Sequence, residues 1–178
     1  MISRPGGLDG LLVFEPRVFR DDRGYFVELH QAARYRDFGL EATFVQDNLS
    51  HSRRGVVRGL HYQWQHPQGK LVSVVRGAIW DVAVDLRRAS PTFGHWWAIR
   101  LDDRTHTQFW LPAGFAHGFQ ALEDDTLVLY KVTDFWQPGD ERTLAWDDPQ
   151  LAIAWPLADA IVSAKDRQGQ RFSEATAF

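Results

Sequence analysis

The chain has 178 residues, 44% of them hydrophobic and 13% aromatic, so we expect a single domain over residues 1–178 with a substantial core. Its formal net charge of −3 argues against nucleic acid or anionic membrane surfaces as partners, and the lack of cysteine excludes disulfides, thiol catalysis and thiolate metal sites. No charged leader precedes an apolar run and no apolar stretch approaches the ~18 residues of a membrane span, so we expect a cytoplasmic protein.

Short segments rich in Val, Ile, Leu, Phe and Trp recur along the chain, separated by Gly, Pro and Asp turn signals. They predict strands at residues 11–19, 43–50, 56–64, 70–75, 78–86, 94–101, 106–112, 118–122 and 126–133. Residues 28–40 predict a helix that ends after a glycine, and the polar composition from Arg167 onward predicts a loosely held terminus. Many short strands joined by short turns favour an antiparallel sandwich or barrel.

The strand predicted at residues 56–64 carries two cationic side chains among valines and aromatics. Arg58 and His61 are three residues apart and would point to opposite faces of a regular strand. Gly59 between them is a candidate β-bulge, which could turn both inward, and Lys70 follows on the next strand. Three such groups buried together would indicate an anionic ligand, whereas separately they are ordinary core and rim residues.

The strand predicted at residues 78–86 carries two aspartates. Asp81 and Asp85 alternate with apolar residues, so we expect two solvated carboxylates on an outer face. In the strand predicted at 126–133, Tyr130 should face the interior, and taken alone it is a packed tyrosine. Lys165 and Asp166 taken alone are a surface ion pair.

A metal or phosphate-binding loop has little support in the sequence. Neither G-x-x-x-x-G-K-[ST] nor G-x-G-x-x-G occurs. The segment PAGFAHG, which contains His117, resembles the second motif of cupin barrels, but the glutamate expected soon after His61 in metal-binding cupins is missing. Two histidines are too few for the usual three protein ligands of a catalytic metal. We therefore expect no metal site and favour acid–base catalysis.

Ten motifs occur in order between about residue 10 and about residue 168: FEPRVFRDDRGYFVE, FVQDNLS, RGLHYQ, QGKLV, DVAVDLRRASPTFG, LPAGFAHGF, LYKVTDFW, WDDP, WP and SAKD. Together they resemble the dTDP-4-dehydrorhamnose 3,5-epimerase family. The resemblance implies an all-β fold, a cupin-like double-stranded β-helix (jelly-roll barrel) with a few short helices. It also implies a homodimer that exchanges edge strands, no cofactor, and dTDP-4-keto-6-deoxy-D-glucose as the nucleotide-sugar substrate, converted to dTDP-4-keto-L-rhamnose.

The resemblance also implies roles for individual residues. His61 matches the catalytic base, Asp166 the carboxylate that orients it, Tyr130 the acid on the opposite side, and Lys70 the lysine beside the sugar carbonyl. Phe26 and Trp136 match positions that stack on thymine. The other positions expected to contact the substrate are Arg23, Glu28, Gln46, Asp47, Asn48, Arg58, His117, Glu141 and Lys165.

One departure from the family pattern keeps alternatives open. Phe135 stands where many relatives have tyrosine, which removes a hydroxyl group near the base or the sugar. The alternatives are an epimerase acting at only carbon 3 or carbon 5, a catalytically silent cupin that binds a sugar nucleotide, and a metal-dependent cupin oxygenase.

Overall fold

The computed structural model describes residues 1–178, and strands make up most of its regular structure. One α-helix, α1, spans Ala32–Asp37, and two short 3-10 helices are η1 (Asp166–Gln168) and η2 (Phe172–Glu174). No helix is long and apolar enough to span a bilayer. The strands are β1 (Ile2–Pro5), β2 (Leu12–Glu15), β3 (Val18–Asp21), β4 (Gly24–Val27), β5 (Gln46–Ser52), β6 (Val56–Gln63), β7 (Lys70–Arg76), β8 (Ala78–Asp85), β9 (Trp96–Asp102), β10 (Gln108–Leu111), β11 (Phe115–Ala121), β12 (Thr126–Val132), β13 (Glu141–Thr143) and β14 (Ile161–Val162).

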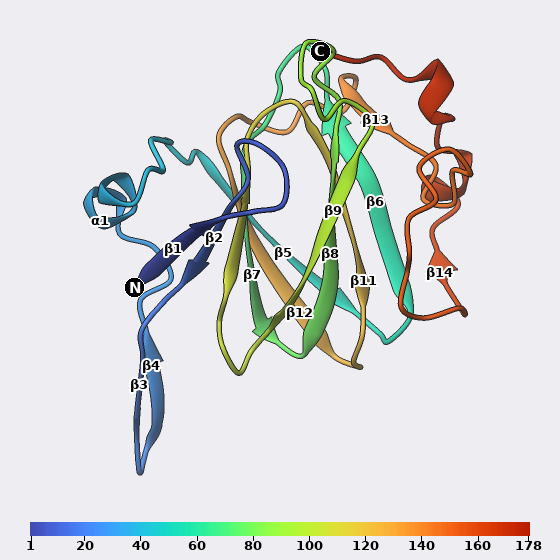
Figure 1. The fold of residues 1–178 in the computed structure, drawn as a ribbon. Coiled ribbons are helices and arrows are strands. Elements are labelled where there is room, and N and C mark those ends of the chain that lie inside the picture. The colour runs from blue at the N-terminus through green and yellow to red at the C-terminus, as the bar shows by residue number, and fades with distance from the viewer.

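Two sheets face each other and form the barrel (Figure 1). The first has the strand order β1-β2-β10-β7-β12-β5, and the second has the order β13-β6-β11-β8-β9, with β14 added in parallel beside β6. All other pairs of neighbouring strands are antiparallel. Some of these pairs, such as β2 and β10, join strands that are far apart in the sequence. The predicted all-β jelly-roll barrel with few helices is therefore confirmed.

The space between the sheets holds the main hydrophobic core. Alternating residues of both sheets point into it, as the two-residue period of strands requires. Burial of these side chains is the main force that holds the sheets face to face. The cluster consists of Leu11, Val13, Val72, Val74, Ile79, Ala83, Leu101, Phe109, Leu111, Phe115, Phe119 and Val128.

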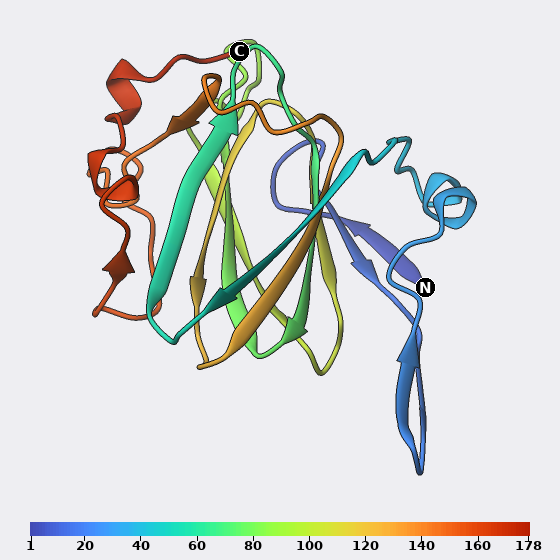
Figure 2. The same ribbon diagram turned by 180° about the vertical axis from the view of Figure 1, so that it is seen from behind.

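The chain after β13 covers the outer face of the second sheet, as seen from behind in Figure 2. Phe172 packs on Phe93 with ring centroids 5.4 Å apart, and Phe178 exchanges backbone hydrogen bonds with Leu86 and Arg88 at 2.9 and 2.7 Å. The prediction of a loosely held terminus from residue 167 onward is therefore wrong. The aromatic residues of this segment fix it to the sheet despite its polar composition.

The segment between β2 and β5 departs from the barrel. The strand predicted at 11–19 is interrupted at Pro16, which has no N–H for a sheet ladder, and the chain continues into a β3–β4 hairpin that projects away from the barrel (Figure 1). The predicted helix over 28–40 is shorter than expected, because it begins only after Gln31, whose side chain caps the Arg34 N–H at 2.6 Å.

Candidate active site

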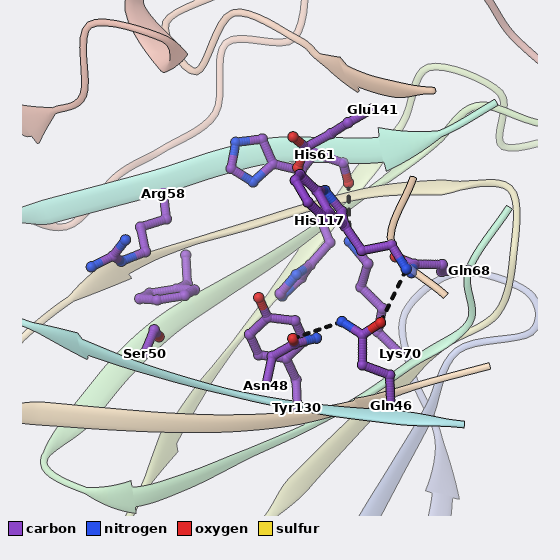
Figure 3. A pocket seen from close by; sticks show the side chains of 12 residues that line it. Gln46, Asn48, Ser50, Arg58, His61, Gln68, Lys70, His117, Tyr130 and Glu141 are labelled. Carbon is purple, nitrogen blue, oxygen red and sulfur yellow. Dashed lines mark hydrogen bonds between the residues drawn. The ribbon is translucent and has the colours of Figure 1, made fainter. Parts of the chain in front are cut away.

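A cavity of about 370 Å³ lies between the two sheets (Figure 3). Strands of both sheets contribute to its wall, so residues that are distant in the sequence face one another across it. Its lining is mostly polar, in contrast to the apolar core beneath it. The lining residues are Gln46, Asn48, Ser50, Arg58, His61, Gln68, Lys70, His117, Phe119, Tyr130, Trp136 and Glu141.

A β-bulge in β6 turns the side chains of Arg58 and His61 into this cavity. His61 pairs with His117 of β11 and Arg58 pairs with Phe119, so two residues of β6 stand opposite one residue of β11. Gly59 occupies the bulge with φ of 118°, and a Cβ there would lie 2.6 Å from the Gly118 Cα. The predicted bulge is confirmed, and only glycine fits its backbone and its close approach to β11.

His61 is held by a carboxylate from the far end of the chain. Its Nε2 lies 2.7 Å from Oδ1 of Asp166 in η1. Burial raises the pKa of the Asp166 carboxyl, but hydrogen bonds from His61 and the Gly59 N–H outweigh burial and hold that pKa below its usual value. Because an ionised carboxylate only accepts hydrogen bonds, Nε2 donates, and the other ring nitrogen, Nδ1, is left as the basic atom.

Lys70 lies at the cavity wall at the start of β7. The residue is only 8% exposed, and its Nζ donates a hydrogen bond of 3.3 Å to the backbone carbonyl of His61. Burial lowers the pKa of the Lys70 amine to about 8, while the carboxylates of Glu141 and Asp81 act in the opposite direction. The amine is therefore a charged donor at neutral pH that can lose its proton at mildly alkaline pH.

Tyr130 reaches the same cavity from β12, in the sheet opposite to that of His61 (Figure 3). Burial and the Glu141 carboxylate raise the pKa of its phenol above the ordinary value, and Arg58 partly opposes them. The phenol therefore keeps its proton at neutral pH. An imidazole and a phenol on opposite walls can act on opposite faces of one ligand.

Asp81 and Asp85 are both fully buried, so the prediction that they are solvated on an outer face is wrong. The terminal segment covers the outer face of the second sheet and the first sheet covers its inner face, so neither face of β8 meets water. Asp81 Oδ1 lies 2.7 Å from His117 Nε2 and forms a second imidazole–carboxylate pair. The signal was in the sequence: apolar residues alternate on both faces of AIWDVAVDL, which is typical of a strand buried on both sides.

Comparison with known proteins identifies the fold and the site together. A family model described as dTDP-4-dehydrorhamnose 3,5-epimerase matches residues 6–174. A protein of that name from Pseudomonas aeruginosa is 54% identical over 170 residues, which cover 94% of each chain. Another from Methanothermobacter thermautotrophicus is 51% identical over 94% of this chain and 92% of its own. This chain belongs to the dTDP-4-dehydrorhamnose 3,5-epimerase family. It is accordingly an isomerase, and the predicted resemblance is confirmed.

Solved structures of related epimerases superpose closely on this member of the family. A dTDP-6-deoxy-D-glucose-3,5-epimerase from Legionella pneumophila, in complex with dTDP-4-keto-L-rhamnose, has a TM-score of 0.94 at 45% identity and covers 98% of this chain and 95% of its own. A 3′-monoepimerase from Streptomyces bikiniensis, in complex with dTDP-quinovose, has a TM-score of 0.89 at 34% identity and covers 95% and 87%. The fold therefore accommodates both double and single epimerases.

Other residues predicted for the epimerase site lie at the rim of the cavity. The Gln46 side chain donates to the Asn48 side chain at 2.8 Å and accepts from the Trp136 backbone N–H at 3.1 Å. Glu141 forms an ion pair with Lys165, the neighbour of Asp166. These contacts link β5, the β12–β13 connection and the segment before η1 around one opening.

Five predicted binding residues do not line the cavity of this epimerase chain, and one of them, Lys165, reaches it only through its ion pair with Glu141. Asp47 lies on the outer side of β5 and binds Lys131 at 2.9 Å, and Glu28 binds Arg34 at 2.8 Å. Arg23 and Phe26 are exposed on the β3–β4 hairpin, where Arg23 pairs with Asp21 at 2.6 Å. The sequence analysis did not anticipate Ser50, Gln68 and Phe119 in the lining, because no motif marks them. No three His, Asp or Glu side chains converge as a candidate metal site.

Proposed function

We propose that this chain converts dTDP-4-keto-6-deoxy-D-glucose to dTDP-4-keto-L-rhamnose by inverting carbon 3 and carbon 5. The observation that carries the proposal is the arrangement of His61 and Tyr130 on opposite walls of one cavity, with Lys70 between the sheets beside them. Inversion through an enolate needs proton removal on one face and proton delivery on the other, which one group does not easily perform. The two walls supply the two groups.

His61 is the base and acts through Nδ1, while Asp166 holds Nε2 and stabilises the imidazolium that forms. A proton beside a ketone is less acidic than imidazolium by roughly ten pKa units, or on the order of 14 kcal/mol. The base alone does not close that gap. The Lys70 ammonium, in a largely buried position, stabilises the enolate oxygen that develops at carbon 4 and supplies several kcal/mol.

Tyr130 completes each inversion. The enolate carbon takes the phenolic proton on the face opposite to His61, which leaves a phenolate on Tyr130 and an imidazolium on His61. Proton exchange with solvent restores the phenol and the neutral imidazole before the second carbon reacts. The raised pKa of Tyr130 supports this role, because the phenol begins each cycle protonated.

The remaining predicted residues bind the substrate in this proposal. Arg58 supplies a guanidinium for the diphosphate, and Trp136 at the cavity rim stacks on thymine. A homodimer places Arg23 and Phe26 of the projecting hairpin at the cavity of the second copy, since they do not reach the cavity of their own chain. The exposure of the hairpin aromatics supports this, because 48% of Phe19, 50% of Tyr25 and 68% of Phe26 is accessible. Asp47 and Glu28 remain predicted contacts.

A deuterium exchange experiment tests the reaction. The protein is incubated with dTDP-4-keto-6-deoxy-D-glucose in D₂O, and NMR follows carbons 3 and 5. Deuterium at both carbons together with formation of dTDP-4-keto-L-rhamnose is the expected result. Substrate binding without deuterium at either carbon contradicts the proposal and identifies a silent sugar-nucleotide-binding cupin.

A single-position epimerase is the second candidate. It is supported by Phe135, the departure from the family pattern noted in the sequence, and it is compatible with the fold, which a 3′-monoepimerase shares. In the same experiment, deuterium at only one of the two carbons would establish this candidate and exclude the first.

A further inference from the structure

Asp81 is a buried carboxylate beside the cavity to which the proposed reaction gives no task. It lies in β8, is fully buried, and uses Oδ1 to bind His117 Nε2 at 2.7 Å. Its second oxygen, Oδ2, has no hydrogen-bond partner. A buried carboxylate with an unused oxygen is destabilising unless nearby positive charge compensates it. The burial of Asp81 therefore suggests that its charge has a function in this site.

Asp85 provides an internal reference on the same strand. It is equally buried and lies on the same face four residues later, but its carboxylate is fully engaged. Arg87 binds both of its oxygens at 2.9 and 2.8 Å, and Ser90 and Thr92 donate to Oδ2 at 2.6 and 2.7 Å. The burial of the Asp85 carboxylate is therefore explained by its local hydrogen bonds, whereas the burial of the Asp81 carboxylate is not.

Burial raises the pKa of the Asp81 carboxyl, and two neighbours oppose this effect: His117 first, through its charge and its hydrogen bond, and then the Lys70 amine. Lys70 makes one hydrogen bond, to a backbone carbonyl, and no direct ion pair. The other ionisable groups that share its cavity are Arg58, His61, His117, Tyr130 and Glu141, and among these only Glu141 carries negative charge. Glu141 is already paired with Lys165. Asp81 is thus the one carboxylate near Lys70 that no other permanent cation neutralises, and its charge raises the pKa of the Lys70 amine against the effect of burial.

We propose that Asp81 is a positioning residue of this site, which orients the His117 ring and supplies the buried negative charge that keeps the Lys70 amine protonated. The inference rests on the proposed role of Lys70 beside the enolate oxygen. Asp81 acts on the reaction through Lys70 and His117 and does not itself touch the substrate.

The lysine content of the chain allows a direct test that does not depend on activity. Lys70, Lys131 and Lys165 are the only lysines, so protein labelled with ¹³C at lysine Cε gives three NMR signals. The signal that disappears in Lys70→Arg is that of Lys70. In Asp81→Asn, which keeps an oxygen for His117 but loses the charge, we expect Lys70 to titrate about one pH unit lower than in the unmodified protein.

Matched variants separate this role from a structural one. Asp85→Asn removes a charge with the same burial on the same strand and should leave the Lys70 titration unchanged. Asp81→Glu should restore the titration of Lys70 seen in the unmodified protein. Asp81→Ser, a smaller neutral residue, should show the same downward shift as Asp81→Asn, and it replaces the asparagine variant if that variant does not fold. Unchanged titration of Lys70 in both neutral variants, or an equal shift in Asp85→Asn, overturns the inference.

Turnover provides the second readout. We expect the alkaline limb of the kcat profile to move down by about one pH unit in Asp81→Asn while KM changes less than about twofold, because only the charge at the enolate is affected. A purely structural role would lower thermal stability without moving the limb. If the unmodified protein shows no exchange at carbon 3 or 5, the proposed function fails, and the NMR titration still decides whether Asp81 controls Lys70.

Discussion

The cavity between the sheets and the β3–β4 hairpin hold the side chains of the proposed function in different ways. His61, Lys70 and Tyr130 are at least partly buried, and each comes from a strand in the interior of a sheet. Arg23 and Phe26 stand on a two-stranded hairpin and are exposed to solvent. A two-stranded ribbon is marginally stable by itself, whereas strands inside a sheet are fixed on both sides.

In the proposed function, this difference separates proton transfer in the cavity from nucleotide binding by the hairpin. Groups that transfer protons need fixed positions and shifted pKa values, which burial in the barrel provides. Groups that hold a nucleotide tolerate exposure and can be supplied by a second copy of the chain. Variants in the cavity should therefore change kcat, and variants on the hairpin should change KM.

The largest expected effect is that of His61→Asn. Loss of the proposed base should reduce exchange at both carbons by about 10³-fold or more, while dTDP binding measured by calorimetry stays within about threefold. His66→Asn, an exposed histidine of the β6–β7 turn, is the control and should behave as the unmodified protein. Normal turnover of His61→Asn would show that another group is the base.

Tyr130→Phe should have the next largest effect. Without the phenolic proton, formation of inverted product should fall about 10²-fold, while deuterium exchange initiated by His61 falls much less. Tyr25→Phe on the hairpin, compared at saturating substrate so that a change in KM does not matter, serves as the control for loss of a tyrosine hydroxyl. An equal fall of exchange and product formation would place Tyr130 in proton removal as well.

On the hairpin, Phe26→Ala should raise KM about tenfold with little change in kcat, since an aromatic stack on a base contributes about 1–3 kcal/mol. Asp22→Ala, at the exposed turn of the same hairpin, should leave both constants unchanged. A fall in kcat without a change in KM would contradict the division between cavity and hairpin.

The last prediction concerns the free energy of unfolding. Burial lowers the Lys70 pKa from 10.5 to about 8, so the folded protein disfavours the charged amine. Lys70→Met should raise the free energy of unfolding by about 1–3 kcal/mol at pH 7 while abolishing efficient turnover. The unfolded chain binds more protons between pH 8 and 10.5, so the advantage of the methionine variant should shrink as pH rises through that range. Urea unfolding of both proteins at pH 7 and pH 10 measures this difference in the free energy of unfolding.

Local sequence patterns predicted the strands and the bulge, and the family resemblance predicted most of the cavity residues, but local patterns did not predict the long-range packing. Gly59 between two cationic residues predicted the bulge, because a glycine at that spacing has a local geometric meaning. The burial of Asp81 was missed, since its side chain points into the space between the two sheets, on the same face as Ile79 and Ala83, and the first sheet covers that face. Likewise, no local pattern reveals that Asp166 meets His61 across 105 positions of the chain.

The bulge at Gly59 also bears on protein engineering. A designer who transfers the arginine and histidine of β6 to another barrel must transfer the extra residue with them, together with a glycine on the neighbouring strand, where a Cβ on Gly118 would lie 2.7 Å from the Arg58 carbonyl oxygen. Grafting the two side chains at the same spacing onto a regular strand would aim one of them at the opposite surface. The site can therefore be transferred only together with the backbone geometry of both β6 and β11, and not as two side chains alone.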